Sequence, residues 1–343
     1  MRPLAIGIIG LNFGKHLIAE LLRPENRAFF RIAAVCDLDR DKAEPMGKQL
    51  GVRAYTDIDA LLADRDIPVI GLFTGPSGRA ALLRRILLAG KDVMTTKPFE
   101  VDPDEAAGVL REAVRRKRVI HLNSPAPVLT PDLEQIARWR QRFNLGRPVA
   151  ARAEAWASYR EQADGTWYDD PVRCPVAPVF RLGIYLINDL IRLFGPAQQV
   201  QVIQSRLSTR RPTPDNAQLG ILFKNGVLAN IYASFCIDDT QEYRNSMTLN
   251  FERGTIYRDV GSLAAKGKPV QLELVTKGKA GRRIVTRKAV ASRSGGYHWS
   301  VFHRAVQGRK PPTAAFIREV VDGLRVITAM SRAERSSSTV EVV

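Results

Sequence analysis

The first 123 residues alternate short apolar runs with amphipathic stretches, and no other feature constrains the fold as strongly. Runs with the length and composition of buried strands lie at residues 4–9, 31–36, 69–73, 92–96 and 119–123. Between them the apolar residues recur at helical spacing, and Asp102-Pro103 supplies the N-cap and first-position proline typical of a helix start. Strands that alternate with helices of about 10–15 residues predict a parallel, doubly wound α/β sheet.

The pattern changes after the proline-rich segment 124–127. Thr130-Pro131 starts a connecting helix that Gly146 stops, and from residue 148 onward many segments are β-branched and alternate apolar with polar residues. Turns such as Asn225-Gly226 separate these segments, which predicts hairpins and a largely antiparallel sheet. Further helices are predicted at residues 179–194, 297–307 and 313–331.

These patterns divide the chain of 343 residues into three parts. We expect an N-terminal doubly wound (Rossmann) domain at 1–123, and a linker with the connecting helix at 124–147. The remainder, 148–343, is expected to form an α+β domain with the antiparallel sheet, which binds substrate and mediates association. Two domains suit this length, at roughly 100–200 residues for each.

The composition excludes several classes of protein. Hydrophobic residues make up 45% and charged residues 25%, which argues against a disordered chain or a coiled coil. Three cysteines without a C-x-x-C pair argue against a disulfide framework, and the four histidines show no metal-ligand spacing, so we expect no catalytic metal. Since the first residues lack the long apolar run of a signal peptide and no run would span a membrane, we expect a cytoplasmic protein.

The formal net charge of +17 raises the question of nucleic-acid binding. The basic residues are spread along the chain, and the densest runs, such as 115–118, carry neither interleaved aromatic residues nor a zinc-finger spacing. Nucleic acid is therefore an improbable partner. A small anionic substrate or cofactor is a simpler use of the positive charge.

A short glycine-containing segment, Gly10-Leu11-Asn12-Phe13-Gly14, follows the first predicted strand. A dinucleotide-binding loop needs glycine there because its backbone turns tightly and approaches a pyrophosphate at a helix N-terminus. The pattern departs from G-x-G-x-x-G: Asn12 stands at the second glycine position, where its tolerance of positive φ would make it a substitute, and Gly14 comes one position early.

Asp37 ends the second predicted strand, 23 residues after Gly14. A carboxylate there can accept hydrogen bonds from the ribose hydroxyls of NAD and would repel the additional phosphate of NADP. Asp37 could instead only cap the following turn, and Arg40 and Lys42 could soften the discrimination. We therefore predict NAD as the preferred cofactor, with NADP as the alternative.

Three segments resemble the glucose–fructose oxidoreductase / inositol dehydrogenase / MocA family. Residues 89–100 (AGKDVMTTKPFE) are similar to the family's segment that ends in Glu-Lys-Pro, with Thr96 in place of the glutamate. Residues 181–195 (RLGIYLINDLIRLFG) resemble its D-x-G-x-H-x-x-D helix, and residues 302–342 resemble its C-terminal end. The resemblance covers nearly the whole chain in the right order.

This resemblance implies an NAD(P)-dependent dehydrogenase or reductase whose substrate, a sugar, polyol or related compound, lies between the two domains. It also implies association of the open sheets, as a homodimer or homotetramer. The cofactor-binding residues expected from the resemblance and from the loop are Gly10, Asn12, Phe13, Gly14, Asp37, Thr74, Pro76, Lys97, Pro98 and Asn123.

Two residues are the predicted catalytic groups. Lys97 follows a parallel strand at the end where ligands collect in doubly wound sheets, although a solvated lysine at a strand end would look the same. Tyr185 stands where the family carries its catalytic histidine, a variant known among relatives. A phenol can donate a proton to a forming alkoxide. A core tyrosine is the alternative.

Arg181, Asn188 and Asp189 are the predicted substrate-binding residues, because their spacing from Tyr185 places all four on one helix face. The resemblance aligns Arg181 and Asn188 with family aspartates. A guanidinium in place of an acid predicts a substrate with a carboxylate, such as a sugar acid or hydroxy acid. Arg181 paired with a protein acid is the alternative. The irregular glycine loop keeps a second function open, a dinucleotide-sensing regulator with little turnover.

Overall fold

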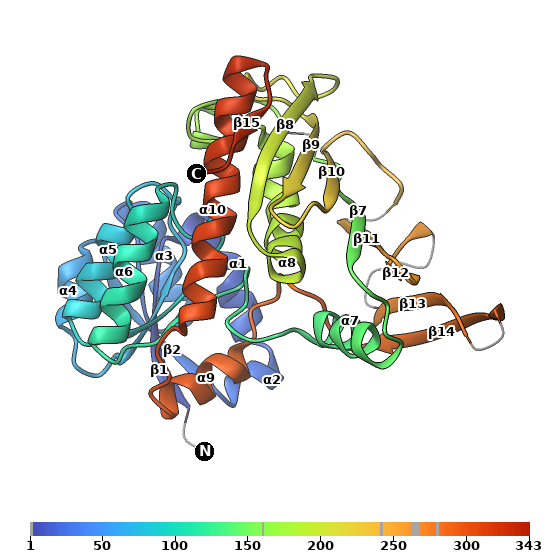
Figure 1. The fold of residues 1–343 in the computed structure, drawn as a ribbon. Coiled ribbons are helices and arrows are strands. Elements are labelled where there is room, and N and C mark those ends of the chain that lie inside the picture. Colours follow the sequence, from blue (N-terminus) through green and yellow to red (C-terminus); the bar gives the residue numbers. More distant parts are fainter. Residues whose placement is uncertain (1–2, 160, 241–242, 262–267, 279–280) are drawn as a thin grey trace. The chain divides into compact units, whose positions relative to one another are not determined.

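The computed structural model describes residues 3–159, 161–240, 243–261, 268–278 and 281–343, which form two compact units (Figure 1). The first unit comprises Met1–Pro127 with Tyr297–Val321, and the second comprises Val128–Gly296 with Asp322–Val343. Part of the C-terminal segment that the sequence assigned to the second domain therefore belongs to the first unit.

The first unit contains, within the described residues, a six-stranded parallel sheet in the order β3-β2-β1-β4-β5-β6. This order is the one that dinucleotide-binding doubly wound folds use. Its strands are β1 (Leu4–Ile9), β2 (Phe30–Cys36), β3 (Arg53–Tyr55), β4 (Val69–Leu72), β5 (Asp92–Thr95) and β6 (Ile120–Leu122). The predicted fold class is confirmed, and only the short edge strand β3 and the short helix α2 have no counterpart in the prediction.

The helices of this unit are α1 (Leu11–Leu21), α2 (Pro24–Arg27), α3 (Arg40–Leu50), α4 (Ile58–Ala63), α5 (Arg79–Leu88), α6 (Pro103–Arg115) and α9 (Trp299–Gln307). As predicted, the Asp102 carboxylate caps α6, accepting hydrogen bonds from the backbone N–H groups of Asp104 and Glu105. This cap satisfies two amides that the helix itself leaves without a partner.

Helix α9 joins the first unit through an aromatic cluster. The Phe302 ring stacks on Phe30 of β2 with centroids 5.4 Å apart, and Trp299 meets the same ring edge-on at 5.7 Å. The indole N–H of Trp299 donates to the Glu20 carboxylate at 2.8 Å. Burial of these aromatic rings explains why a segment so late in the sequence folds with the first unit.

The second unit contains a nine-stranded sheet, counted over the described residues, in the order β14-β13-β12-β11-β7-β10-β9-β8-β15. Its strands are β7 (Pro148–Trp156), β8 (Ala197–Ser205), β9 (Asn216–Phe223), β10 (Leu228–Ser234), β11 (Arg244–Phe251), β12 (Gly254–Arg258), β13 (Val270–Lys277), β14 (Arg283–Val290) and β15 (Val340–Glu341). Neighbouring strands are antiparallel except β7 and β10, which agrees with the predicted open, mostly antiparallel sheet.

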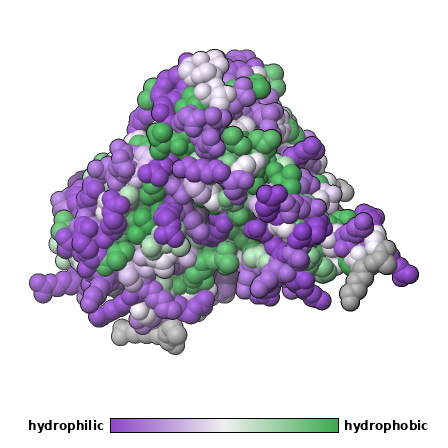
Figure 2. Space-filling view, viewed as in Figure 1, coloured by the Kyte–Doolittle hydropathy of each residue, from purple (hydrophilic) through white to green (hydrophobic). Residues whose placement is uncertain are grey.

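In the described part of the second unit, this sheet is accompanied by α7 (Pro131–Arg142), α8 (Ile184–Phe194) and the part of α10 (Ala314–Ser336) from Asp322 onward, the earlier part of α10 belonging to the first unit. A π-helical turn, η2 (Val179–Gly183), leads directly into α8, and a short 3₁₀ turn, η1 (Trp167–Asp169), precedes it. The turn η2 packs on β7, β9 and β10. Among the described helices, none combines the length and apolarity needed to cross a lipid bilayer. Hydrophilic side chains predominate on the molecular face drawn in Figure 2.

Candidate functional site

The glycine segment forms a tight cradle at the carboxyl end of β1. Gly10 has φ +87°, and a Cβ on it would lie 3.0 Å from the backbone carbonyl carbon and oxygen of Phe73. A Cβ on Gly14 would lie 3.1 Å from Ile8, so this second glycine allows α1 to pack closely on β1. The two glycines therefore supply the tight turn and the close helix–strand contact that a dinucleotide loop requires.

Asn12 and Phe13 lie exposed in the first turn of α1. The backbone of Asn12 is helical, so tolerance of positive φ is the wrong reason for asparagine at this position. Phe13 is 43% exposed and meets the Phe73 ring edge-on at 6.4 Å. Phe13 thus lies beside Phe73, the residue whose backbone approaches Gly10.

Asp37 lies beside the same cradle, at the end of β2. One of its carboxylate oxygens accepts a hydrogen bond from the backbone N–H of Leu11 at 2.8 Å, and the other accepts from Asp39 at 3.1 Å. These contacts fix the carboxylate next to the glycine loop while each oxygen keeps acceptor capacity.

Two further loops follow β4 and β5. After β4, the Thr74 hydroxyl oxygen is buried and has no hydrogen-bond partner within the described part of the chain, and Pro76 is buried next to it. After β5, the backbone N–H of Lys97 donates to the side-chain oxygen of Asn123 at 2.9 Å. Lys97 itself is partly exposed, and Pro98 after it is buried.

The predicted cofactor residues therefore come from five separate segments and share one location. They follow β1, β2, β4, β5 and β6, and because these strands are parallel, their carboxyl ends lie at one edge of the sheet. Each of these features fits one part of a dinucleotide. The tight backbone turn at Gly10 fits the pyrophosphate, and the Asp37 carboxylate fits the adenosine ribose. The unsatisfied Thr74 hydroxyl fits a polar group of the nicotinamide or its ribose.

In the second unit, Tyr185 lies near the start of α8 and is partly buried. A Cβ on Gly295, which has φ +102°, would lie 3.0 Å from its ring carbons, so the glycine backbone forms one wall of the tyrosine site. The Tyr243 ring meets Tyr185 edge-on with centroids 6.3 Å apart. Burial raises the pKa of Tyr243 to about 12, although its oxygen accepts a hydrogen bond from Asn245 at 3.0 Å.

The side chain of Arg181 is engaged by a protein acid. Its two terminal nitrogens donate to the two carboxylate oxygens of Glu161 at 2.6 and 2.7 Å. The guanidinium also lies 4.0 Å from the ring centroid of Tyr168 and 4.7 Å from that of Phe235. Burial raises the pKa of Glu161, but the hydrogen bonds and charge of Arg181 outweigh it and leave the pKa lowered.

A second arginine completes this charge network. Arg211 also contacts Glu161, at 3.2 Å, and pairs with Asp164 at 2.9 Å and Asp169 at 2.5 Å. Three carboxylates thus face two guanidinium groups. The planar guanidinium of Arg181 is bound to Glu161, as in the alternative in which Arg181 pairs with a protein acid. This pairing counts against Arg181 as the residue that binds a substrate carboxylate.

The expected polar stripe on one helix face does not form. Because Arg181 lies in the π-helical turn η2 and not in α8, the regular helical spacing that the prediction assumed is interrupted. Asp189 is 3% exposed and accepts hydrogen bonds from Arg258 at 2.9 Å and Ser294 at 2.6 Å. Asn188 is 5% exposed and packs against Gly323 of α10. Such burial counts against direct substrate contact by either residue.

The sequence prediction missed Glu161, Arg258 and Asp132. Arg258 is fully buried and joins Asp189 to Asp132 of α7, which its guanidinium contacts at 2.8 Å. Each partner is distant along the chain, so only tertiary structure reveals the cluster. Burial of charged groups without such pairing would be strongly destabilising.

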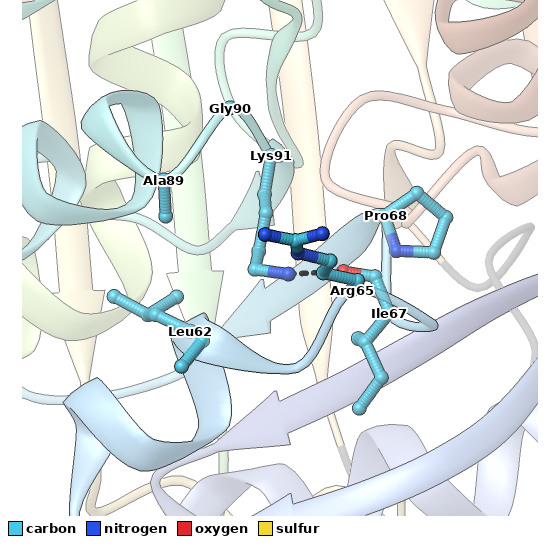
Figure 3. A pocket seen from close by; sticks show the side chains of 8 residues that line it. Leu62, Arg65, Ile67, Pro68, Ala89, Gly90 and Lys91 are labelled. Carbon is cyan, nitrogen blue, oxygen red and sulfur yellow. Dashed lines mark hydrogen bonds between the residues drawn. The ribbon is translucent and has the colours of Figure 1, made fainter.

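A cavity of about 360 Å³ in the first unit is distinct from this site (Figure 3). Its lining includes Ile67 and Pro68 just before β4 and Lys91 just before β5, so it lies at the amino ends of these strands. The Lys91 ammonium donates to the backbone oxygens of Asp64 and Ile67, both at 2.6 Å. Since cofactors of doubly wound sheets bind at the opposite edge, the cavity is not a candidate for the cofactor. No metal-binding cluster of His, Cys, Asp or Glu occurs among the residues that the structure describes.

Comparison with known proteins agrees with this geometry. The chain is 25% identical over 237 residues, 68% of each chain, to UDP-N-acetylglucosamine 3-dehydrogenase of Acidithiobacillus ferrooxidans. An NAD-binding oxidoreductase from Klebsiella pneumoniae superposes with a TM-score of 0.76 at 19% identity, covering 99% of both chains. Levoglucosan dehydrogenase, in a complex with NADH and L-sorbose, superposes with a TM-score of 0.77 at 14% identity over all of both chains.

The family profiles match both halves of the sequence. Residues 4–124 match the oxidoreductase family with an NAD-binding Rossmann fold, and residues 133–257 match the GFO/IDH/MocA C-terminal domain. Together the matches cover most of the chain. The protein therefore belongs to the GFO/IDH/MocA family of oxidoreductases.

Proposed function

We propose that this protein is an NAD(H)-dependent dehydrogenase or reductase acting on an alcohol or carbonyl carbon of a sugar-like substrate. The observation that carries the proposal is the convergence of the predicted cofactor residues at one edge of the first unit's sheet. The Gly10 cradle, the Asp37 carboxylate and the Lys97 loop come from separate segments, and a dinucleotide needs all of them together.

Asp37 supports NAD over NADP as the cofactor. Its carboxylate is held beside the glycine loop by Leu11, where it can accept hydrogen bonds from both ribose hydroxyls. A phosphate on the 2′ oxygen would bring negative charge against this carboxylate. Arg40 lies nearby in sequence, but its guanidinium is 3.4 Å from Glu44, so part of its charge is already balanced.

Lys97 and Tyr185 are the proposed catalytic residues. Nicotinamide supplies the hydride acceptor or donor, so the protein has to hold the substrate oxygen and move one proton to or from it. The hydrogen bond from the Lys97 backbone to Asn123 fixes the segment that carries the ammonium. Gly295 and Tyr243 fix the ring of Tyr185, so its hydroxyl is held by packing.

The structure favours a neutral substrate over an acidic one, which revises the prediction made for Arg181. Its charge is paired with Glu161 and covered by Tyr168, and among the described residues of this network three carboxylates outnumber two guanidinium groups. The name of levoglucosan dehydrogenase includes a neutral sugar, which agrees with a neutral substrate, whereas the nucleotide sugar in the other relative's name carries a charged diphosphate beside its neutral ring. We therefore propose a neutral sugar or polyol as the substrate class.

Self-association through the open sheet is the proposed quaternary arrangement, as a homodimer or homotetramer. Along β7, Ala151, Ala153 and Ala155 are buried, whereas Arg152 and Glu154 on the other face are exposed. A broad sheet with one uncovered face is a common surface for symmetric association. Light scattering after size-exclusion chromatography measures the mass directly.

Assays with NADH, NADPH and a panel of carbonyl compounds test the proposed activity. Consumption of NADH with a neutral ketose or aldose, faster than with the matching acid, is the expected result. Tight NADH binding without turnover on any member of a broad panel would favour the regulatory alternative.

A further inference from the structure

Arg79 occupies a position that is unfavourable for a cation. It is the first residue of α5, where the helix dipole is positive, and it is only 1% exposed. Burial lowers the pKa of its guanidinium to about 10, although the charge of Glu100 opposes this change. Burial of the charge and the positive end of the helix dipole both disfavour a cation at this position, so other contacts must stabilise Arg79.

Glu100 supplies part of the compensation. One oxygen of its carboxylate accepts from the backbone N–H of Ala80 in the first turn of α5 at 2.7 Å, and the other accepts from Val101 at 2.8 Å. Glu100 is 2% exposed, so its buried negative charge at the helix start stabilises the guanidinium electrostatically.

The guanidinium of Arg79 bridges the two loops that follow β4 and β5. Its Nη1 donates to the backbone oxygens of Thr96 at 2.6 Å and Phe99 at 3.3 Å, and also to that of Pro98. Its Nη2 donates to the backbone oxygen of Thr74. The carbonyls of residues 96 and 98 lie immediately before and after Lys97, and Thr74 belongs to the other predicted cofactor loop.

We propose that Arg79 is a positioning residue that fixes the Lys97-Pro98 segment against the Thr74–Pro76 loop and thereby sets the place of the Lys97 ammonium. The inference rests on the proposed function, since Lys97 is catalytic only in that function. The planar fork of arginine reaches carbonyls on both loops at once. A lysine ammonium at this position carries its three donors on one nitrogen, so we expect it to reach fewer of these carbonyls than the two terminal nitrogens of arginine do.

Two further hydrogen bonds anchor the Lys97 segment in addition to the Arg79 contacts. The Lys97 backbone N–H is held by Asn123, and the hydroxyl of Thr96 accepts from that of Tyr297 at 2.6 Å. Both anchors attach the Lys97 segment to other elements, β6 and the start of α9. The Tyr297 ring also meets that of Phe73, the neighbour of Thr74, with centroids 5.8 Å apart. Arg79 adds a direct hydrogen bond from its side chain to Thr74 itself.

The substitution Arg79→Lys tests the inference, with Arg85→Lys as the matched control. Arg85 lies on the same helix, but its guanidinium is 40% exposed and pairs with Asp59 at the surface. Amide hydrogen exchange of peptides covering residues 96–101, and NADH affinity measured by calorimetry, are compared with wild type. We expect Arg79→Lys to speed exchange in this peptide and to weaken NADH binding, each about tenfold, and Arg85→Lys to change neither.

The outcomes separate the inference from the proposed function. If wild type fails to bind NADH, the proposed function fails, while exchange at 96–101 still decides whether Arg79 fixes the segment. Wild-type exchange there in Arg79→Lys would overturn the inference. So would an equal increase in exchange throughout the first unit, because that result would mean a general loss of stability. Arg79→Gln, in which the charge is absent but a donor remains, should show the same local effect more strongly.

Discussion

Replacing Gly10 by alanine tests the cradle most sharply. Gly10 has φ +87° and ψ 94°, a backbone conformation that costs an L-residue about 1–3 kcal/mol. The new Cβ would also lie 3.0 Å from the carbonyl carbon and oxygen of Phe73. Because these are backbone atoms at the end of a central strand, they cannot rotate away, and we expect a total loss of about 3 kcal/mol in unfolding free energy.

Gly51→Ala is the matched control. Gly51 also has positive φ, +65°, but a Cβ there meets no atom within 4 Å among the described residues. It lies in the ordinary left-handed region, so alanine should cost only about 1 kcal/mol. The difference of about 2 kcal/mol between the two variants then measures the contact with Phe73 together with the less favourable backbone conformation of Gly10.

Urea unfolding and NADH calorimetry on both variants give the result. We expect Gly10→Ala to weaken NADH binding at least tenfold, because the loop must move away from β4, and Gly51→Ala to bind NADH like wild type. Equal stability losses in the two variants, with NADH affinity intact in Gly10→Ala, would refute this account of the loop.

Four other predictions concern single residues. Lys97→Ala and Tyr185→Phe should each lower kcat by roughly 10²–10⁴ while NADH affinity changes little, and near-wild-type turnover would remove that residue from proton transfer. Asp37→Ser should reduce the preference for NADH over NADPH; an unchanged ratio in calorimetry would contradict the ribose contact. Glu161→Gln should leave Arg181 unbalanced and shift turnover toward acidic sugars, and an unchanged acid-to-neutral ratio would show that the pair lies outside the substrate site. Burial lowers the pKa of His121 from 6.5 to about 3, so the unfolded chain takes up its proton first as the pH falls. The unfolding free energy is therefore unaffected above pH 6.5 and falls as the pH drops toward 3, with a loss of about 2 kcal/mol at about pH 5. Urea unfolding of wild type and His121→Leu should show a steeper pH dependence in wild type.

The sequence predicted the fold because its signals are local. Apolar runs and caps such as Asp102 mark β1, β2, β4, β5, β6 and the helices between them, and their alternation leaves a parallel sheet as the simple solution. The sequence placed helix α9 in the wrong domain because its partner Phe30 lies about 270 residues earlier. No local sequence pattern indicates in which hydrophobic core Phe302 is buried.

The site was predictable in part for the same reason. Gly10, Asp37 and Lys97 follow strands, so their common edge follows from the parallel sheet. The partner of Arg181 could not be predicted from the sequence in the same way. The prediction assumed a regular helix through Arg181, and the π-helical turn η2 interrupts that spacing. Arg79 reads as an ordinary polar helix start in the sequence, and only the packed loops around it reveal a buried guanidinium.

A crystal structure with NADH tests the central claim most directly. The account predicts the pyrophosphate against the backbone of residues 10–13, the adenosine ribose on Asp37, and the nicotinamide beside Thr74 and the Lys97-Pro98 segment. A dinucleotide bound away from this edge of the sheet, or crystals that take up no NADH at saturating concentration, would contradict it.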